Sequence, residues 1–442
     1  MTAYPRIGQV PLRHRMREIG RVVFWILCLF WLVAASIGLA VHVTDQRRLV
    51  YDFSQEWTSA RDFWAGRPVY GSFPDSLEFH LGRRVETPIR FNAHPPASVL
   101  LALPLAPLAQ FPAYLAWTAI SISCLATSLW LMLRAPGIQL SATETLGFVT
   151  FAVAGNAVSH HLIQGQINLL LLLLLTGAWS ADQRGFSAAG GVLVGIAAAL
   201  KLFPAFLVLY YLTVGKWRGL GGILLGFAAL NLFAFAVLGL EPFIDYTRTV
   251  LPATQEFRDW WGNASLWGFW SKLLDGSSGQ VVPIAYHPRL AWCLGLLSCL
   301  LAVACTIRRT FPLRNSPVSD LSWAAFLVIM LLVSPITWEH YFVLLFLPGL
   351  ILWKASRHRP GRACFVLAAL GLLVTVNGSW IVVAVLPADV RPAQTPAGPV
   401  WVLTVLSYQF YALLGLAVVT LRQLADPAAN SSGEVPKGCG AA

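Results

Sequence analysis

Three long apolar stretches of the chain are each interrupted near the middle by a polar cluster. The stretches run over 146–179, 188–214 and 321–353, and the interruptions carry histidine, lysine, glutamate and amide side chains. Polar groups at bilayer depth cost several kcal/mol, and non-helical backbone persists there only where protein or water satisfies it. The pattern therefore predicts three helical hairpins whose polar tips converge on one cavity.

The composition is that of a polytopic membrane protein. Hydrophobic residues make up 57% of the 442 residues and charged residues only 12%, whereas a soluble domain carries roughly 25% charged residues. Apolar runs of roughly 18 or more residues recur along the chain, which is typical of transmembrane helices. We expect one all-helical membrane domain over 22–422, preceded by a basic cytoplasmic tail at 1–21 and followed by a disordered cytoplasmic tail at 423–442.

The placement of charge predicts the topology. Five arginines precede the first span, and basic residues beside a first span hold that side in the cytoplasm. Keeping every short basic loop inside gives about twelve crossings of the cell (inner) membrane, with both termini cytoplasmic. The predicted spans and hairpin arms are 22–43, 113–133, 143–163, 166–180, 186–200, 202–214, 219–240, 288–307, 321–336, 341–353, 363–386 and 400–421.

Two polar segments, 44–112 and 241–286, become outer loops in this topology. Within the first loop, the proline-broken segment 96–110 is predicted to be interfacial or re-entrant; if it crossed, the later basic loops would lie outside. The net charge of +11 favours contact with anionic membrane lipids and not with nucleic acid. The chain has no D-x-D and no H-x-x-x-H pattern, so we expect neither a metal nor a cofactor.

Asp52 is the candidate catalytic group. It follows the first span directly, which places it at the membrane surface beside the expected cavity. A carboxylate against apolar walls loses hydration and is suited to take a proton from an attacking hydroxyl. Alternatively, Asp52 caps a helix over 53–65, with Glu56 on the same face.

The hairpin tips carry groups suited to a phosphate or a sugar. Lys201 would anchor an anionic group, although a lysine there also snorkels to the interface. His160, His161 and His340 are suited to pair with phosphate or carboxylate, or they are satisfied structural groups.

Amide and carboxylate groups complete the set. Gln166 and Asn168 suit sugar hydroxyls, or they bond one helix to another. We also count Glu339, beside His340, and Asn263, in a loop rich in tryptophan, among the substrate-binding candidates. Asn263 begins an Asn-Ala-Ser triplet that fits the glycosylation pattern, which is a weak match.

The order of these motifs resembles glycosyltransferase family 87, bacterial membrane enzymes of the GT-C fold. That group includes the α-mannosyltransferases of phosphatidylinositol-mannoside synthesis and related arabinofuranosyltransferases. The resemblance covers nearly the whole chain, most clearly 45–350. It rests on Asp52-Phe53, Gly66-Arg67-Pro68-Val69-Tyr70, Phe91 to Pro96, Gly165 to Asn168, Lys201-Leu202-Phe203-Pro204, Asn263 to Leu266, and Ser334 to His340.

The resemblance implies a fold, a reaction and roles for residues. It implies a GT-C enzyme that transfers a sugar, mannose or alternatively arabinose, from a polyprenyl-phosphate donor to a lipid-linked or envelope glycan on the outer face, with inversion. Asp52 matches the family's catalytic base and His340 the histidine placed near the donor phosphate, where we also place Lys201. Many relatives carry a second histidine where Tyr341 stands, and an arginine where Lys272 is the nearest basic residue, which leaves the sugar open.

Two other classes of function remain. A transporter or flippase of a lipid-linked sugar would also use broken helices and polar groups within the membrane. It should be accessible from both faces, whereas the predicted polar tips all lie on one side. A membrane scaffold with incidental polar groups is the third class, and it does not explain three interrupted hairpins.

Overall fold

The computed structural model describes residues 12–45, 51–87, 89–314, 320–386 and 396–425. All regular elements in these ranges are helical, and a single isolated bridge joins Val281 to Ala397. The predicted all-helical fold is therefore confirmed. Of the predicted tails, 1–11 and 426–442 lie outside the described residues, whereas 12–21 form the start of α1 and 423–424 the end of α21.

Six described helices are long and apolar enough to cross a membrane, and a bent pair makes a seventh. The expectation of a polytopic membrane protein is confirmed, whereas the count of twelve crossings is not, because the other hairpin arms are short. The long helices are α1 (Leu12–Val43), α5 (Gln110–Leu133), α6 with α7 (Ala142–Ala154, Asn156–Gln164), α11 (Trp217–Leu238), α15 with η4 (Pro288–Thr310, Phe311–Leu313), and α20, η6 and α21 (Pro399–Leu403, Val405–Ser407, Tyr408–Leu424).

The three predicted hairpins are present, and each reverses at its polar cluster. Gly165 closes α7 with a φ of 67°, a left-handed conformation that favours glycine. Pro204 lies in the first turn of the short helix that follows Lys201, where its fixed φ suits a helix start. The remaining arms are α8 (Asn168–Gln183), α9 (Ser187–Leu200), η1 (Phe203–Leu207), α10 (Val208–Thr213), α16 (Asp320–Val333), η5 (Glu339–Leu345) and α17 (Phe346–Ser356).

One predicted span is wrong in its course. The segment 363–386 is not straight: α18 (Pro360–Val374) and α19 (Gly378–Val385) meet at an angle of 85°. Asn377 lies at the bend, and its side chain accepts from Trp380 N at 3.2 Å, which caps a new helix. The predicted straight span is therefore a bent pair of helices.

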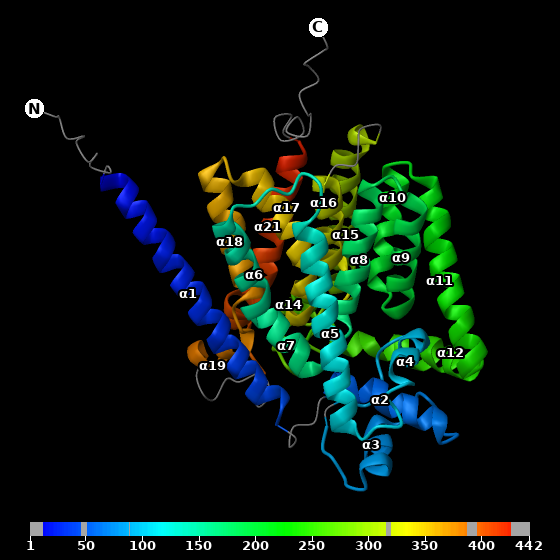
Figure 1. The fold of residues 1–442 in the computed structure, drawn as a ribbon. Helices are drawn as coiled ribbons and strands as arrows, with labels where there is room; N and C mark the ends of the chain where they lie inside the picture. Colours follow the sequence, from blue (N-terminus) through cyan, green and yellow to red (C-terminus); the bar gives the residue numbers. More distant parts are fainter. Residues whose placement is uncertain (1–11, 46–50, 88, 315–319, 387–395, 426–442) are drawn as a thin grey trace, which may run out of the picture.

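Short helices gather at one end of the bundle, as Figure 1 shows for α2, α3, α4 and α12. With only seven residues, α4 is too short to cross a bilayer, which agrees with the predicted interfacial course of 96–110. These four helices are α2 (Tyr51–Trp64), α3 (Phe73–Leu81), α4 (Pro96–Ala102) and α12 (Glu241–Asp245), and α12 is followed along the chain by η2 (Tyr246–Val250), α13 (Leu251–Ala253), η3 (Thr254–Phe257) and α14 (Leu266–Leu274).

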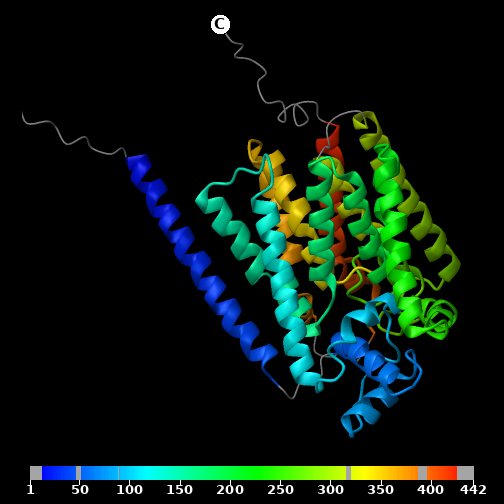
Figure 2. The ribbon, with the colours of Figure 1, turned by 45° about the vertical axis from the view of Figure 1, so that its right-hand side comes forward.

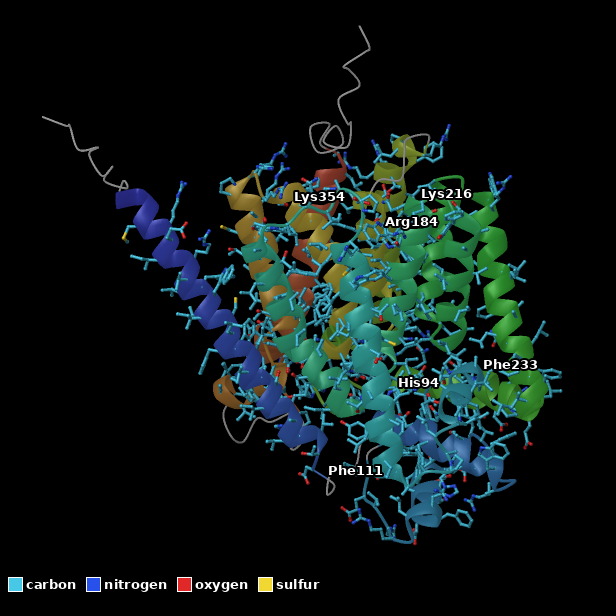
Figure 3. All side chains as sticks on the ribbon, viewed as in Figure 1. His94, Phe111, Arg184, Lys216, Phe233 and Lys354 are labelled. Atoms are coloured by element: carbon cyan, nitrogen blue, oxygen red, sulfur yellow. The ribbon has the colours of Figure 1, made fainter. Side chains whose placement is uncertain are left out.

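The basic loops gather at the opposite end. Figure 3 places Arg184, Lys216 and Lys354 at that end, away from His94 and Phe111. The first turn of α1 and the last turn of α21 lie at the same end (Figure 1). The predicted cytoplasmic loops, the start of α1 and the end of α21 thus lie at the same end of the bundle.

The centre and the edge of the bundle differ in their packing. Every residue from Leu321 to Leu332 of α16 is buried, whereas α1 stands at the edge of the bundle (Figure 2) with only 6% of its apolar window buried. Between these extremes, α9 and α11 approach closely: a Cβ at Gly191 would lie 2.0 Å from Gly219 O. Glycine is needed there because no side chain fits between the two backbones.

Candidate active site

The tips of the three hairpins meet around Lys201. Its ammonium, buried at the end of α9, donates to Gln166 Oε1 at 3.0 Å and to Asn168 Oδ1 at 3.2 Å. It also lies 4.2 Å from the ring centroid of Tyr341, at the third tip. The predicted convergence of the tips is therefore present, and Lys201 does not snorkel to the interface.

The histidines lie together but are not equivalent. His340 packs against His160 with a ring separation of 5.5 Å, and Asn168 Nδ2 donates to the His340 carbonyl at 3.1 Å. His160 is partly exposed, with Nδ1 3.8 Å from Glu339 Oε2. His161 and His340 are buried, and neither ring nitrogen of either residue has a hydrogen-bond partner in the described part of the chain.

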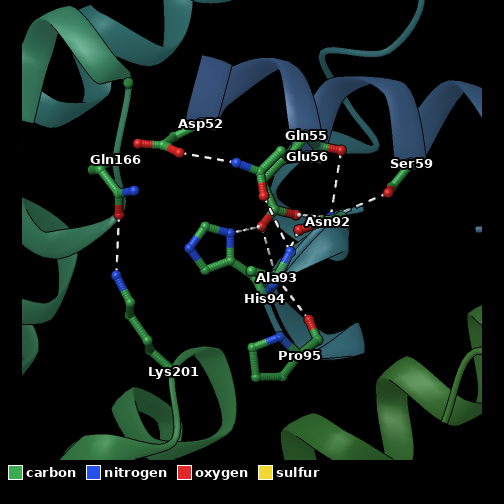
Figure 4. A network of polar contacts seen from close by, with 12 residues as sticks. Asp52, Gln55, Glu56, Ser59, Asn92, Ala93, His94, Pro95, Gln166 and Lys201 are labelled. Atoms are coloured by element: carbon green, nitrogen blue, oxygen red, sulfur yellow. Dashed lines mark hydrogen bonds and ion pairs between the residues drawn. The ribbon is translucent and has the colours of Figure 1, made fainter. Parts of the chain in front are cut away.

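Asp52 lies in the first turn of α2, which begins at Tyr51. The residue is helical, so the alternative in which Asp52 is the N-cap is not what the structure has. Its half-buried carboxylate accepts a hydrogen bond from Gln55 Nε2 at 2.9 Å. Its charge acts on the Lys201 ammonium through space. Figure 4 shows Asp52 on one side of Gln166 and Lys201 on the other.

A second polar network, which the sequence did not predict, follows Asp52 along α2 (Figure 4). Glu56, one turn on, accepts from Ser98 Oγ at 2.9 Å and lies 2.8 Å from His94 Nδ1. Gln55 Oε1 accepts from Ala93 N at 3.1 Å. These contacts fasten the segment around His94 to α2. A lone histidine before two prolines is typical of a loop, and nothing local pairs it with Glu56.

Glu339 and Asn263, two of the predicted substrate-binding residues, form hydrogen bonds with other parts of the protein. The Glu339 carboxylate accepts from Asn156 Nδ2 at 3.0 Å, from Gln409 Nε2 at 3.1 Å and from Gly378 N. These donors come from α7, α21 and the first residue of α19. The carboxylate thereby joins three separate parts of the bundle.

Asn263 is fully buried and bonded on both sides of its amide. Its Nδ2 donates to Arg258 O and Pro335 O, and its Oδ1 accepts from Ser265 N and Thr337 N, at 2.8–3.1 Å. The side chain holds the 258–265 loop against the third tip. It is not accessible for glycosylation.

Lys272, in α14, lies next to Asn263. Its ammonium is fully buried and donates to three carbonyl oxygens, those of Trp261, Asn263 and Leu406. Burial without a carboxylate lowers the pKa of this amine to about 7, because the charged form loses its hydration. Lys272 therefore anchors the loop, and it does not reach the Lys201 cluster directly.

Two surface hollows, of about 340 and 400 Å³, lie away from the Lys201 cluster: one on α5 and α8, the other at the far end of α2. Neither is lined by Asp52, Lys201 or His340. Within the described ranges, no group of three or more His, Cys, Asp or Glu side chains is arranged to hold a metal ion.

Comparison with known protein families identifies the family to which this chain belongs. A sequence model of glycosyltransferase family 87 matches residues 92–335, more than half of the chain. The chain belongs to glycosyltransferase family 87. This match contains the first two hairpin tips and the 258–265 loop and ends at Pro335, at the start of the third tip, so Lys201 and its amide partners belong to a membrane glycosyltransferase.

Two curated proteins are similar to this chain. It is 28% identical over 430 residues to a polyprenol-phosphate-mannose-dependent α-(1→2)-phosphatidylinositol mannoside mannosyltransferase of Mycobacterium tuberculosis, covering 91% of this chain and 92% of that protein. It is 29% identical over 267 residues to an α-(1→3)-arabinofuranosyltransferase of Corynebacterium glutamicum, covering 58% of each protein. The chain thus spans less than two thirds of the arabinofuranosyltransferase but nearly all of the mannosyltransferase.

Among solved structures, the chain is similar to ArnT from Cupriavidus metallidurans in the apo state. The match has a TM-score of 0.36 and 15% identity, and it covers 90% of this chain and 76% of that one. A TM-score this low does not establish a shared arrangement of individual helices.

Proposed function

We propose that this family 87 enzyme transfers a sugar from a polyprenyl-phosphate donor to a lipid-linked or envelope glycan acceptor, with Asp52 as the general base. The observation that carries the proposal is the placement of a half-buried carboxylate and a buried ammonium on either side of Gln166 (Figure 4). One group suits the attacking hydroxyl and the other the departing phosphate.

The reaction needs one proton transfer and one displacement. Asp52 takes the proton of the acceptor hydroxyl as that oxygen bonds to the anomeric carbon. The bond from this carbon to the phosphate oxygen breaks, and the electron pair leaves with the lipid phosphate. Lys201, with His340 beside it, stabilises the developing charge. Attack opposite the phosphate inverts a β-linked donor to an α-glycoside.

The amides of the first tip hold the cation in place. Gln166 and Asn168 offer Lys201 only neutral oxygens, so its charge stays available to an anion. The partly exposed His160 and the buried His161 border the same cluster. In this scheme Gln166, Asn168 and the two histidines shape the donor site, whereas Glu339 and Asn263 hold its walls.

The donor sugar is proposed to be mannose, with arabinose as the alternative. The mannosyltransferase supports the first choice over 91% of the chain, and the arabinofuranosyltransferase supports the second over 58%. The membrane orientation is part of the proposal. With Arg184, Lys216 and Lys354 inside (Figure 3), α2–α4 and the 241–286 loop lie on the outer face of the cell membrane, both termini are cytoplasmic, and 22–422 is a single catalytic domain.

Transfer from a labelled donor tests this function. Membranes containing the protein are incubated with radiolabelled polyprenyl-phosphate mannose and, separately, polyprenyl-phosphate arabinose. We expect label in a new lipid or glycan with one of them. If neither donor yields a product while labelled donor crosses the bilayer, the alternative of a flippase for a lipid-linked sugar is correct.

A further inference from the structure

The segment before α4 brings a histidine to the candidate site. His94 and Glu56 are both nearly buried, with 7% and 5% exposure, and His94 Nδ1 lies 2.8 Å from Glu56 Oε1. This contact is close but is not aligned as a hydrogen bond, and no hydrogen bond or ion pair joins the other ring nitrogen, Nε2, to the described residues. Figure 4 shows this edge of the imidazole directed toward Gln166 and Lys201, below Asp52.

The neighbouring contacts hold the imidazole in this position. Glu56 also accepts from Ser98 Oγ, and Asn92 Oδ1 accepts from the His94 backbone N–H at 3.0 Å. An ionised carboxylate only accepts hydrogen bonds, so a carboxylate oxygen 2.8 Å from Nδ1 favours the tautomer of neutral His94 that carries its proton on Nδ1. Nε2 is then left as an acceptor, since the partner of one ring nitrogen decides the state of the other.

A histidine–carboxylate pair that only stabilises the fold does not have to face the candidate site. His80 provides the comparison within the same outer segment: its Nε2 lies 2.9 Å from the buried Asp62 carboxylate. His80 borders the hollow at the far end of α2, together with Arg61 and Trp64. Each of the two histidines pairs with a carboxylate of α2, but only His94 is directed toward Lys201.

We propose that His94 is a substrate-contacting residue whose Nε2 accepts a hydrogen bond from a hydroxyl of the transferred sugar, while Glu56 is a positioning residue that fixes its tautomer. The inference rests on the proposed function, because it places the sugar between Asp52 and Lys201. A ring hydroxyl is the donor that a fixed imidazole lone pair selects, so His94 contributes to the choice of sugar.

The test compares variants of the full-length protein in detergent, using the labelled donor that the wild type accepts. His94→Phe keeps a planar ring and removes the acceptor; it should lower kcat/KM by about 10- to 100-fold, the range of a lost hydrogen bond to a buried partner. His94→Gln, which retains an acceptor oxygen, should recover part of this loss. Glu56→Gln should lower kcat/KM as well, and the His94→Phe/Glu56→Gln double variant should be no slower than His94→Phe.

The matched control is His80→Phe, which removes the other buried pair of α2. It should change the thermal unfolding temperature at least as much as His94→Phe and leave kcat/KM unchanged. A series of monodeoxy donors supplies a second readout: one of them should be slow with the wild type and no slower with His94→Phe than the full sugar. If His94→Phe does not fold, His94→Gln and Glu56→Gln with the same donors decide the matter.

The outcomes separate this proposal from the proposed function. Wild-type kcat/KM in His94→Phe, or additive losses with Glu56→Gln, would overturn the role of His94 while transfer itself stands. Absence of transfer by the wild type from every donor would instead overturn the function.

Discussion

Replacement of Lys201 by methionine tests how the site handles the departing phosphate. Methionine has a similar length and no charge, and the ammonium is buried with two amide oxygens as its hydrogen-bond partners. A phosphodiester gains one negative charge when it leaves. At about 4 Å and an effective dielectric constant of about 20, an ammonium stabilises that charge by about 4 kcal/mol. Each 1.36 kcal/mol is tenfold in rate, so kcat should fall by up to about a thousandfold.

The assay measures kcat and KM for transfer from the labelled donor, together with thermal unfolding. Lys216→Met is the matched control at the opposite end of the bundle, where Nζ lies 2.7 Å from the buried Asp182 carboxylate. Breaking that pair should cost about 3–5 kcal/mol of stability with little effect on kcat. A Lys201→Met enzyme within tenfold of wild-type kcat would refute the phosphate role, and an equal loss in Lys216→Met would reduce it to a stability effect.

Substitutions at three further positions test separate parts of the account. Glu339→Gln places an amide N–H₂ among three donors and should lower the free energy of unfolding by about 1–3 kcal/mol; a kcat loss at unchanged stability would instead assign Glu339 to substrate. Tyr341→Leu removes the ring beneath Lys201 and should cost about 0.5–2 kcal/mol of transition-state stabilisation, whereas Tyr341→Phe should retain wild-type kcat/KM; equal losses would point to the hydroxyl. Burial lowers the pKa of Lys272 to about 7 from 10.5, so between these values the unfolded chain binds more protons and wild-type stability should rise with pH. Thermal unfolding of Lys272→Met should lack this rise, and an identical slope would show that Lys272 is not its source.

The hairpins were predictable because their signal is local. A glycine, a proline or a charged residue inside an apolar run stands out against its neighbours, and the observed arms end within a few residues of the predicted positions. The bend at Asn377 was missed because its cause is partly distant: Asn377 Nδ2 donates to Asn156 Oδ1 at 3.1 Å. A single asparagine gives little warning of such a break.

The roles of polar side chains depended on partners far along the chain. Glu339 was predicted to bind substrate, but its donors Asn156 and Gln409 lie 183 and 70 residues away. His94 was not predicted at all, since Glu56 is 38 positions from it. Residue type and spacing indicated which groups gather at the tips. Only the packing of the bundle shows which of these groups form hydrogen bonds within the protein.

The central claim is that Asp52 removes the acceptor's proton across from a phosphate held near Lys201. Its most direct test is the rate of sugar transfer by Asp52→Asn, an isosteric change that cannot accept the proton. The account predicts a loss of about 10²- to 10⁴-fold in kcat, with unchanged thermal unfolding and unchanged binding of the polyprenyl-phosphate donor. Turnover near the wild-type rate would contradict it.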